Sequence, residues 1–465
     1  MRRFRYGLAA AVAGAAWLAP RAATAQGYGV YEHGTCAMGR AGVGVASPCT
    51  DGSAIFFNPA GLAAPGLDVR GRQTAMAGVT FIMPRGSFTD AATGEQMKYR
   101  PKTYPIPHAF LTSGIGDRVA VGVGLFAPYG LATEWDDQSA GRFLGYHSEI
   151  QGVYVQPTIA ARITDWLSLG GGVDFSFVEV QLKQRVDLAG QTAAPGVTFS
   201  NLGVASGTDF ADLNLEGGGN STGFHVGAIV KATDRLSLGA RYLSQQSIDI
   251  DDGQADFTQV ATGLVLAPNN PLGLPGGTPV DALVAGQFAD GAPLGDQAGT
   301  TELFFPWQFV LGASFRASDR FTLHFDWQYV NWSAFEKLQI EFENAGTRVV
   351  PEDYGDTNGF RLGGDFAVAP GTIVRAGILK HGAAAPDQTV TPNLPEGARD
   401  EFTFGVGHRF TPHFGLDFAY QFIDQQNRQG RTVEPLPGEE PTAALNNGLY
   451  TFSAHLIGLS LTYEF

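Results

Sequence analysis

The feature that most constrains the fold is an alternation of apolar and polar side chains, with a period of two residues, along most of the chain. Residues 321–329 are apolar at every odd position, and residues 402–410 and 414–422 largely repeat the pattern. Successive side chains of a β-strand point to opposite faces, so each segment has one apolar and one polar face. The segments are longer than the ~5–6 residues of ordinary globular strands. The pattern therefore favours membrane-crossing strands with an outward apolar face over a soluble β-sandwich, whose apolar faces point inward.

The connections between these segments alternate in length. Six are tight and rich in Asp, Gly and Pro, residues that favour turns: 116–118, 164–166, 233–235, 318–320, 370–371 and 411–413. Seven are long and polar: 84–102, 128–146, 183–219, 251–302, 344–357, 382–399 and 429–447. Six short and seven long connections separate fourteen strands, an even number as in single-chain bacterial barrels, whose short turns are periplasmic. The sequence predicts an all-β protein, a 14-stranded antiparallel transmembrane β-barrel in the outer membrane of a Gram-negative cell.

The first 25 residues have the pattern of a secretory signal peptide. Three arginines precede an apolar run over 7–19, and Ala23-Thr24-Ala25 forms a small-residue cleavage site before Gln26. The alternative, a membrane anchor, is disfavoured because the run is shorter than the ~20 residues that span a bilayer. Removing the leader changes the formal charge from −15 to about −19, because four arginines are lost. An acidic chain without basic runs argues against nucleic acid as a partner.

Residues 26–65, which we call the hatch, differ from the rest of the chain. They are rich in glycine, show almost no alternation and contain both cysteines. We expect this segment to be partly helical and to fold inside the barrel formed by residues 66–465. Cys36 and Cys49 would meet an oxidising compartment and are predicted to form a disulfide that stabilises the hatch by about 3 kcal/mol. Free thiols or a metal pair are the alternatives, although no nearby Cys/His spacing supports a metal.

The chain ends in an alternating strand, residues 457–465, with the aromatic Phe465 at its C-terminus. This strand resembles the terminal signal that the outer-membrane insertion machinery recognises, so this machinery and outer-membrane lipid are expected partners. A closed barrel explains how so much polar backbone can lie in lipid, because closure pairs every N–H and C=O group.

Four stretches together resemble the FadL/TodX family of outer-membrane transporters for long-chain fatty acids and hydrocarbons. They are Gly39-Arg40-Ala41 followed by Asn58-Pro59-Ala60, then residues 127–135, residues 326–335, and residues 385–389 continuing to Leu394-Pro395 and Arg399. The resemblance covers the whole mature chain. It implies a fourteen-stranded barrel that contains a hatch of ~40 residues. It also implies capture of the ligand in a groove of the extracellular loops, an apolar pocket beside the hatch, and lateral exit at a kinked third strand. Passage would be passive. The ligand would bind one conformation of the hatch more tightly than another and so shift the population toward it. We expect the protein to be a monomer.

Each candidate site residue has a functional interpretation and a purely structural one. Asn58, Pro59 and Ala60 form the hatch motif, in which Pro rigidifies the turn and Asn bonds the following backbone. Pro128, Tyr129 and Gly130 mark either a break in strand pairing at the lateral exit or the start of a loop. The candidate ligand-binding residues line the pocket or groove, or else pack the plug and bond across the lumen: Tyr28, Phe56, Phe57, Phe143, Leu144, Arg361 and Arg375.

The inward-pointing ionisable residues also include Arg241, Asp326, Asp365, Arg409 and Asp417. A fatty carboxylate would need one cation near the pocket, since charge-assisted hydrogen bonds are the strong ones. The sequence does not identify which one, because pairing across the lumen explains each of them equally.

The motifs of common enzymes are absent: the chain has no G-x-S-x-G, P-loop or H-E-x-x-H sequence. We therefore predict no catalysis, no cofactor and no metal. The predicted function is passive import of hydrophobic small molecules, with long-chain fatty acids as the first candidate. Aromatic or alkane hydrocarbons are the first alternative. A porin is disfavoured by the apolar hatch, and an outer-membrane lipase by the lack of a Ser/His pair.

Overall fold

The computed structural model describes residues 27–430 and 446–465. The predicted signal peptide, residues 1–25, and most of the last long connection lie outside these described residues. Within them the chain forms a closed, fourteen-stranded antiparallel β-barrel, as predicted. The first and last strands close it along seventeen residue pairs, from Thr74 opposite Glu464 to Asp90 opposite Gly448.

Ten of the wall strands are continuous and four are each built from two pieces. The continuous strands are β1 (Gln73–Asp90), β3 (Tyr104–Ile115), β4 (Val119–Glu134), β5 (His147–Arg162), β6 (Leu167–Asp187), β9 (Asp209–Lys231), β18 (Thr372–His381), β19 (Arg399–Arg409), β20 (Phe414–Gln429) and β21 (Gly448–Glu464). The divided strands are β10 (Leu236–Leu243) with β11 (Gln246–Gln259), β12 (Gln297–Phe305) with β13 (Gln308–Arg316), β14 (Phe321–Val330) with β15 (Lys337–Phe342), and β16 (Gly346–Pro351) with β17 (Thr357–Ala369).

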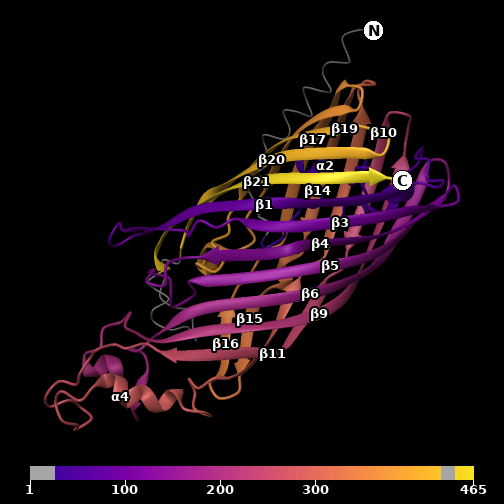
Figure 1. Ribbon diagram of the computed structural model, residues 1–465. Coiled ribbons are helices and arrows are strands. Elements are labelled where there is room, and N and C mark those ends of the chain that lie inside the picture. The colour runs from indigo at the N-terminus through magenta and orange to yellow at the C-terminus, as the bar shows by residue number, and fades with distance from the viewer. Residues whose placement is uncertain (1–26, 431–445) are drawn as a thin grey trace.

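The two ends of the barrel differ, because tight turns join the strands at one end and long connections at the other (Figure 1). The long connections carry small elements: β2 (Gln96–Lys98), β7 (Thr192–Ala194), β8 (Val197–Thr198), η2 (Phe199–Leu202), α4 (Val280–Val284), η3 (Ala285–Phe288), η4 (Trp332–Ala334) and η5 (Asp387–Thr389). Several strands continue beyond the start of the predicted loops, so that β1 reaches Asp90 and β6 reaches Asp187. The predicted break at residues 128–130 therefore lies inside β4 and not at its end.

The outer face of the wall is apolar. Leu111 and Phe177 are 55% and 56% exposed, and many strand residues resemble them: Val123, Ile159, Leu169, Phe224, Leu238, Leu311, Phe325, Phe360, Phe402, Phe404, Phe418 and Leu459. A continuous apolar surface of this kind is stable only against lipid or a partner. Among the described residues, no helix has both the length and the apolar character needed to span a bilayer.

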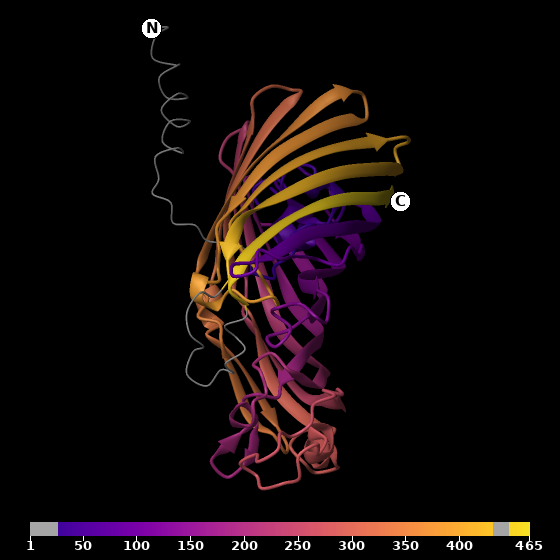
Figure 2. The ribbon, with the colours of Figure 1, turned by 90° about the vertical axis from the view of Figure 1, so that its left-hand side faces the viewer.

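The inner face is polar and surrounds most of the hatch, whose indigo ribbon lies inside the barrel in Figure 2. The hatch contains the short helices α2 (Thr35–Met38) and α3 (Ala54–Phe57) and the 3-10 turn η1 (Pro59–Ala63). Hatch and wall meet at backbone distance in several places. A Cβ atom on Gly405 would lie 2.8 Å from Gly39 Cα, and one on Gly239 would lie 2.1 Å from the Val45 carbonyl oxygen. Glycine at these wall positions allows the hatch chain to pass against the strands.

Candidate functional site

The Asn58-Pro59-Ala60 motif joins the hatch to two wall strands. The fully buried Asn58 amide nitrogen donates hydrogen bonds to the carbonyl oxygens of Val45 (2.7 Å), Ala228 (3.0 Å) and Ala240 (3.2 Å). Its side-chain oxygen accepts from the Ala60 N–H at 3.1 Å and so begins η1. The two N–H groups of one side chain are therefore shared among backbone acceptors on three separate segments.

Ionic contacts fix the other side of the hatch. Arg40 donates to Asp365 of β17 at 2.9 Å, and its guanidinium also lies 3.2 Å from His324. Asp326 of β14 accepts from the backbone N–H groups of Gly44 and Val45 at 2.8 and 3.2 Å. Buried charges are stable only when they are paired or hydrogen-bonded, and these contacts give the hatch one defined position against the wall.

Cys36 and Cys49 are joined by a disulfide that closes a loop across α2. Asp51 lies close to both sulfur atoms, within 4.8 Å. The bond occupies both thiols, so this group does not offer thiolate ligands to a metal.

An aromatic cluster lies between the hatch and the wall, where strands β3, β4, β5 and β12 and the 3-10 turn η4 contribute its members. Phe56 contacts Tyr31, His33, Phe57 and Phe126, with ring centroids 4.8–5.7 Å apart. Further members complete the cluster: Tyr28, Phe110, Tyr129, Tyr154, Phe305, Trp332, Phe335 and Tyr354. Burial raises the pKa of Tyr31 to about 12, so this phenol is neutral at physiological pH. The predicted residues Tyr28, Phe56 and Phe57 thus lie together.

Two arginines lie against this cluster without a carboxylate partner among the described residues. The Arg241 guanidinium lies 4.3 Å from the Phe56 ring centroid and donates to Gln308 at 3.3 Å, while its Nε and Nη2 atoms have no hydrogen-bond partner. Arg361 lies 4.5 Å from the Tyr31 ring and contacts His381 at 3.1 Å. Such buried unsatisfied donors are rare in folded proteins and call for an explanation.

Arg375 has a different environment from these two arginines. It donates to Asp417 at 2.5 Å and lies 3.6 Å from Asp365. Its charge is therefore balanced by wall carboxylates, as expected if Arg375 bonds across the lumen.

The wall has a gap between β3 and β4. The two strands pair only from Ile115 opposite Val119 to Ala109 opposite Leu125. Beyond this point the remaining part of β3, residues 104–108, pairs with β1 alone. Pro105 and Pro107 have no N–H groups to leave unsatisfied at such an edge. The gap ends where the Arg100 N–H donates to the Glu134 carbonyl at 2.9 Å.

A bulge in β4 lies beside this gap and holds the start of the hatch. The pairing of β4 with β5 shifts register between Phe126 and Tyr129. The Val30 N–H donates to the Pro128 carbonyl at 2.8 Å, and the Gly130 N–H donates to the Tyr28 carbonyl at 2.9 Å. The predicted residues Pro128, Tyr129 and Gly130 are thus brought to the hatch.

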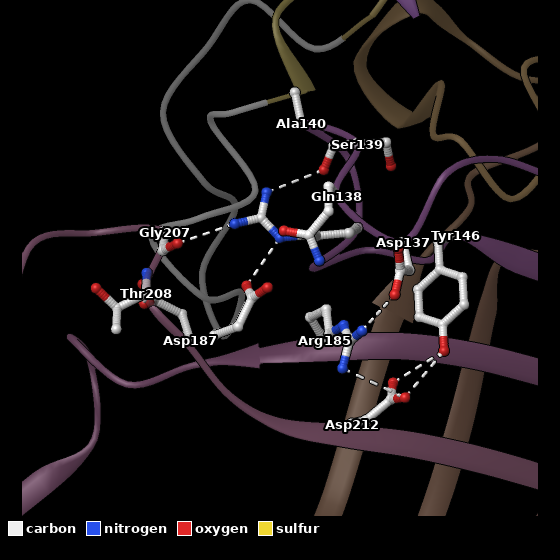
Figure 3. A network of polar contacts seen from close by, with 12 residues as sticks. Asp137, Gln138, Ser139, Ala140, Tyr146, Arg185, Asp187, Gly207, Thr208 and Asp212 are labelled. Carbon is white, nitrogen blue, oxygen red and sulfur yellow. Dashed lines mark hydrogen bonds and ion pairs between the residues drawn. The ribbon is translucent and has the colours of Figure 1, made fainter. Parts of the chain in front are cut away.

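The long-loop candidates Phe143 and Leu144 lie apart from the aromatic cluster. Phe143 is buried under the Arg142 guanidinium, whose carbon lies 4.3 Å from the ring centroid. Figure 3 shows the polar network that fixes this loop, in which Arg185 bonds Asp137 at 2.6 Å. The connections after β6 and β11 pack around a separate apolar cluster that includes Phe199, Phe210, Val280 and Val284.

Sequence reasoning did not single out Arg241 from the other inward charges, nor Gln156, Gln328 and Trp332, which are buried beside the lumen with unsatisfied side-chain atoms. Alternation places these residues on the inner face. It carries no signal for which of them lack partners, because partners come from distant strands.

Comparisons with known proteins agree with this geometry. The family profile described as "Outer membrane protein transport protein (OMPP1/FadL/TodX)" matches residues 16–465. Outer membrane protein P1 of Haemophilus influenzae is 24% identical over the full length of both chains, and the long-chain fatty acid transport protein of Escherichia coli K12 is 22% identical over 94% of both. A Pseudomonas aeruginosa FadL homologue has a similar structure, with a TM-score of 0.77 at 22% identity over 94% of this chain and 99% of the other. The Pseudomonas putida toluene transporter TodX superposes with a TM-score of 0.66 at 17% identity, over 94% and 99% of the two chains.

Proposed function

The chain belongs to the OMPP1/FadL/TodX family of outer-membrane transport proteins, and we propose that its cargo is a long-chain fatty acid whose carboxylate is held by Arg241. The family membership makes it a transporter of hydrophobic molecules in the Gram-negative outer membrane. The cargo itself, the roles of the site residues and the role of residues 26–65 as a movable hatch are parts of this proposal.

The observation that carries the proposal is the environment of Arg241. This side chain is only 3% exposed, two of its nitrogen atoms lack hydrogen-bond partners, and no carboxylate of the described chain pairs with it. A fatty acid supplies what the site lacks, namely a carboxylate for the guanidinium and an alkyl chain for the surrounding rings. Charge-assisted hydrogen bonds to a buried arginine are the strongest available to such a head group.

The proposed route follows the geometry of the hatch. Cargo enters from the loop end, the head group reaches Arg241, and the chain lies along Phe56, Phe126 and Tyr129. Displacement of residues 28–30 from the β4 bulge then connects the pocket with the β3–β4 gap, through which the cargo leaves sideways into lipid. The cargo needs only to bind the displaced hatch more tightly than the docked one.

Aromatic hydrocarbons are a second candidate, because the buried cluster beside Arg241 consists largely of Phe, Tyr and Trp rings. Such cargo would use the same site without needing the guanidinium. The aromatic cluster therefore supports both candidates, and Arg241 distinguishes them.

The test compares oleate with oleyl alcohol, which has the same chain but no charge. Oleate binding to purified protein in mild detergent should weaken about 10–100-fold in Arg241→Gln, the range expected for a lost charged hydrogen bond, while oleyl alcohol binding stays unchanged. Arg241→Lys, which keeps the charge, should recover part of the affinity. Arg235→Gln, in an exposed turn of the same hairpin, is the matched control. An oleate affinity within twofold of wild type in Arg241→Gln would refute the anchor, and toluene binding without oleate binding would favour the hydrocarbon candidate.

A further inference from the structure

The wall has a second interruption, on the strands β12 to β15. β13 and β14 pair from Arg316 opposite Thr322 to Gln308 opposite Val330. Pairing resumes only between β12 and β15, at Thr301 opposite Ile340. Between these ladders, residues 302–307 and 331–339 form no strand pairs with each other, and the chain of the second strand bends inward through η4. The opening is therefore several residues high.

A hollow of about 490 Å³ covers this interruption on the outer surface. It is lined by Asp249, Asp251, Thr300, Thr301, Glu302, Phe304, Ala334, Glu336, Lys337, Gln339 and Glu341. Five carboxylates against one lysine give this rim a formal charge of −4. Because a charged rim is unstable in hydrocarbon, the hollow belongs at the level of the lipid headgroups or above.

A row of aromatic side chains marks that level. Tyr242, Trp307 and Tyr329 lie next to one another on the outer face, with successive ring centroids 5.9 and 5.1 Å apart. Exposed apolar residues such as Leu311 and Phe325 lie between this row and the tight turns. Aromatic rows of this kind sit at the membrane–water interface. The hollow therefore faces the headgroup region of the outer leaflet.

The hatch closes this opening from inside. The Tyr28 hydroxyl donates to the Phe304 carbonyl, and the Tyr28 ring lies 4.7 Å from Trp332 and 5.9 Å from Phe335. The Tyr129 hydroxyl donates to a second carbonyl of the interruption, that of Pro306, at 2.7 Å. Two backbone acceptors left by the missing strand pairs are thus satisfied by side chains from the lumen, and one of them belongs to the hatch.

We propose that this interruption is a second lateral opening, gated by Tyr28, which admits uncharged amphiphiles from the outer leaflet and disfavours carboxylates. The inner side of the opening is the aromatic cluster, which suits an apolar chain. The outer side is acidic, so an anionic head group at roughly 10 Å from the rim should be disfavoured about 2- to 10-fold after screening. The opening thus differs in selectivity from the loop end of the barrel.

The same hatch segment also closes the β3–β4 gap. Residues 28–30 bond the bulge of β4 through the backbone, while the Tyr28 side chain bonds β12. Displacement of this segment therefore releases both openings together. Cargo entering at the acidic opening would itself displace Tyr28 and so open the exit.

The experiment blocks the hollow chemically. The chain has two cysteines and both are in the disulfide, so an added cysteine is a unique thiol. Ala334→Cys lines the hollow, whereas Ala92→Cys, in the exposed turn after β1, is a matched control. Both variants are expressed in Gram-negative cells that lack their own long-chain transporter, are labelled from outside with a bulky neutral maleimide, and are assayed for uptake of radiolabelled oleyl alcohol and oleate.

Labelling of the Ala334→Cys variant should reduce oleyl alcohol uptake several-fold and leave oleate uptake within twofold, and labelling of the control variant should change neither. Tyr28→Phe, which keeps the ring but loses the hydroxyl, should raise oleyl alcohol uptake in unlabelled cells. Complete labelling with unchanged oleyl alcohol uptake would overturn the second opening, and an equal loss for both cargoes would overturn its selectivity. Neither result depends on whether Arg241 binds oleate.

Discussion

Replacing Asn58 by Asp tests whether one side chain determines the docking of the hatch. The change preserves size and shape, and an aspartate oxygen can still accept from the Ala60 N–H. The ionised carboxylate cannot donate, so the hydrogen bonds to Val45, Ala228 and Ala240 are lost and three carbonyls face a buried charge. The amide has two N–H groups, which the three acceptors share, so the loss is counted as two hydrogen bonds at about 1 kcal/mol each, roughly 2 kcal/mol, and the unpaired charge adds about 1 kcal/mol or more.

A loss of about 3 kcal/mol corresponds to a roughly hundredfold larger population of the undocked hatch. Hydrogen exchange measured by mass spectrometry on peptides spanning residues 44–61 reports this population directly. Exchange in the wall strands should stay unchanged, because the strands keep their own pairing. Asn269→Asp, in an exposed loop, makes the same chemical change without these partners and should have no effect. Exchange in Asn58→Asp within threefold of wild type would refute the reasoning.

Two further predictions concern the same segment. Replacing both Cys36 and Cys49 by Ser removes a crosslink between residues 13 positions apart in the sequence. Hydrogen exchange in the hatch should rise about a hundredfold, corresponding to about 3 kcal/mol, while exchange in the wall stays unchanged. Equal hatch exchange in the variant and the wild type would refute this. Burial lowers the pKa of His33 from 6.5 to about 3, with smaller contributions from His108 and Arg241. Docking of the hatch should therefore be fully stable above pH 6.5 and weaken as the pH falls toward 3. The difference in acid sensitivity between wild type and His33→Gln measures this contribution, and parallel pH profiles of hatch exchange would contradict it.

Features that depend on local sequence could be predicted, whereas features that depend on pairing could not. The alternation in Phe321–Val330 and the Asp-containing turns are local, and they led to the correct number of strands. The divided strands have weaker signals. Pro306 marks the end of β12, but the register shift between β13–β14 and β12–β15 arises from how two distant strands meet.

The candidate site shows the same division. Alternation places Arg375 on the inner face, but its partner Asp417 is 42 residues away, across an intervening strand. Asn58 is recognisable as part of a motif, yet two of its three acceptors lie 170 and 182 residues away in the wall. The position of a side chain on a strand follows from the periodicity, and its chemistry follows from neighbours that only the closed barrel brings together.

The backbone contacts between hatch and wall bear on the order of assembly. Gly39 and Gly405 touch at a distance that leaves no room for a methyl group, so the amino-terminal segment cannot be threaded past a finished ring of strands without widening it. The seam between β1 and β21 joins the two wall strands that lie furthest apart along this chain. We expect the amino-terminal segment to be laid against the growing sheet before this seam is sealed, so that biogenesis ends with an interior that is already occupied.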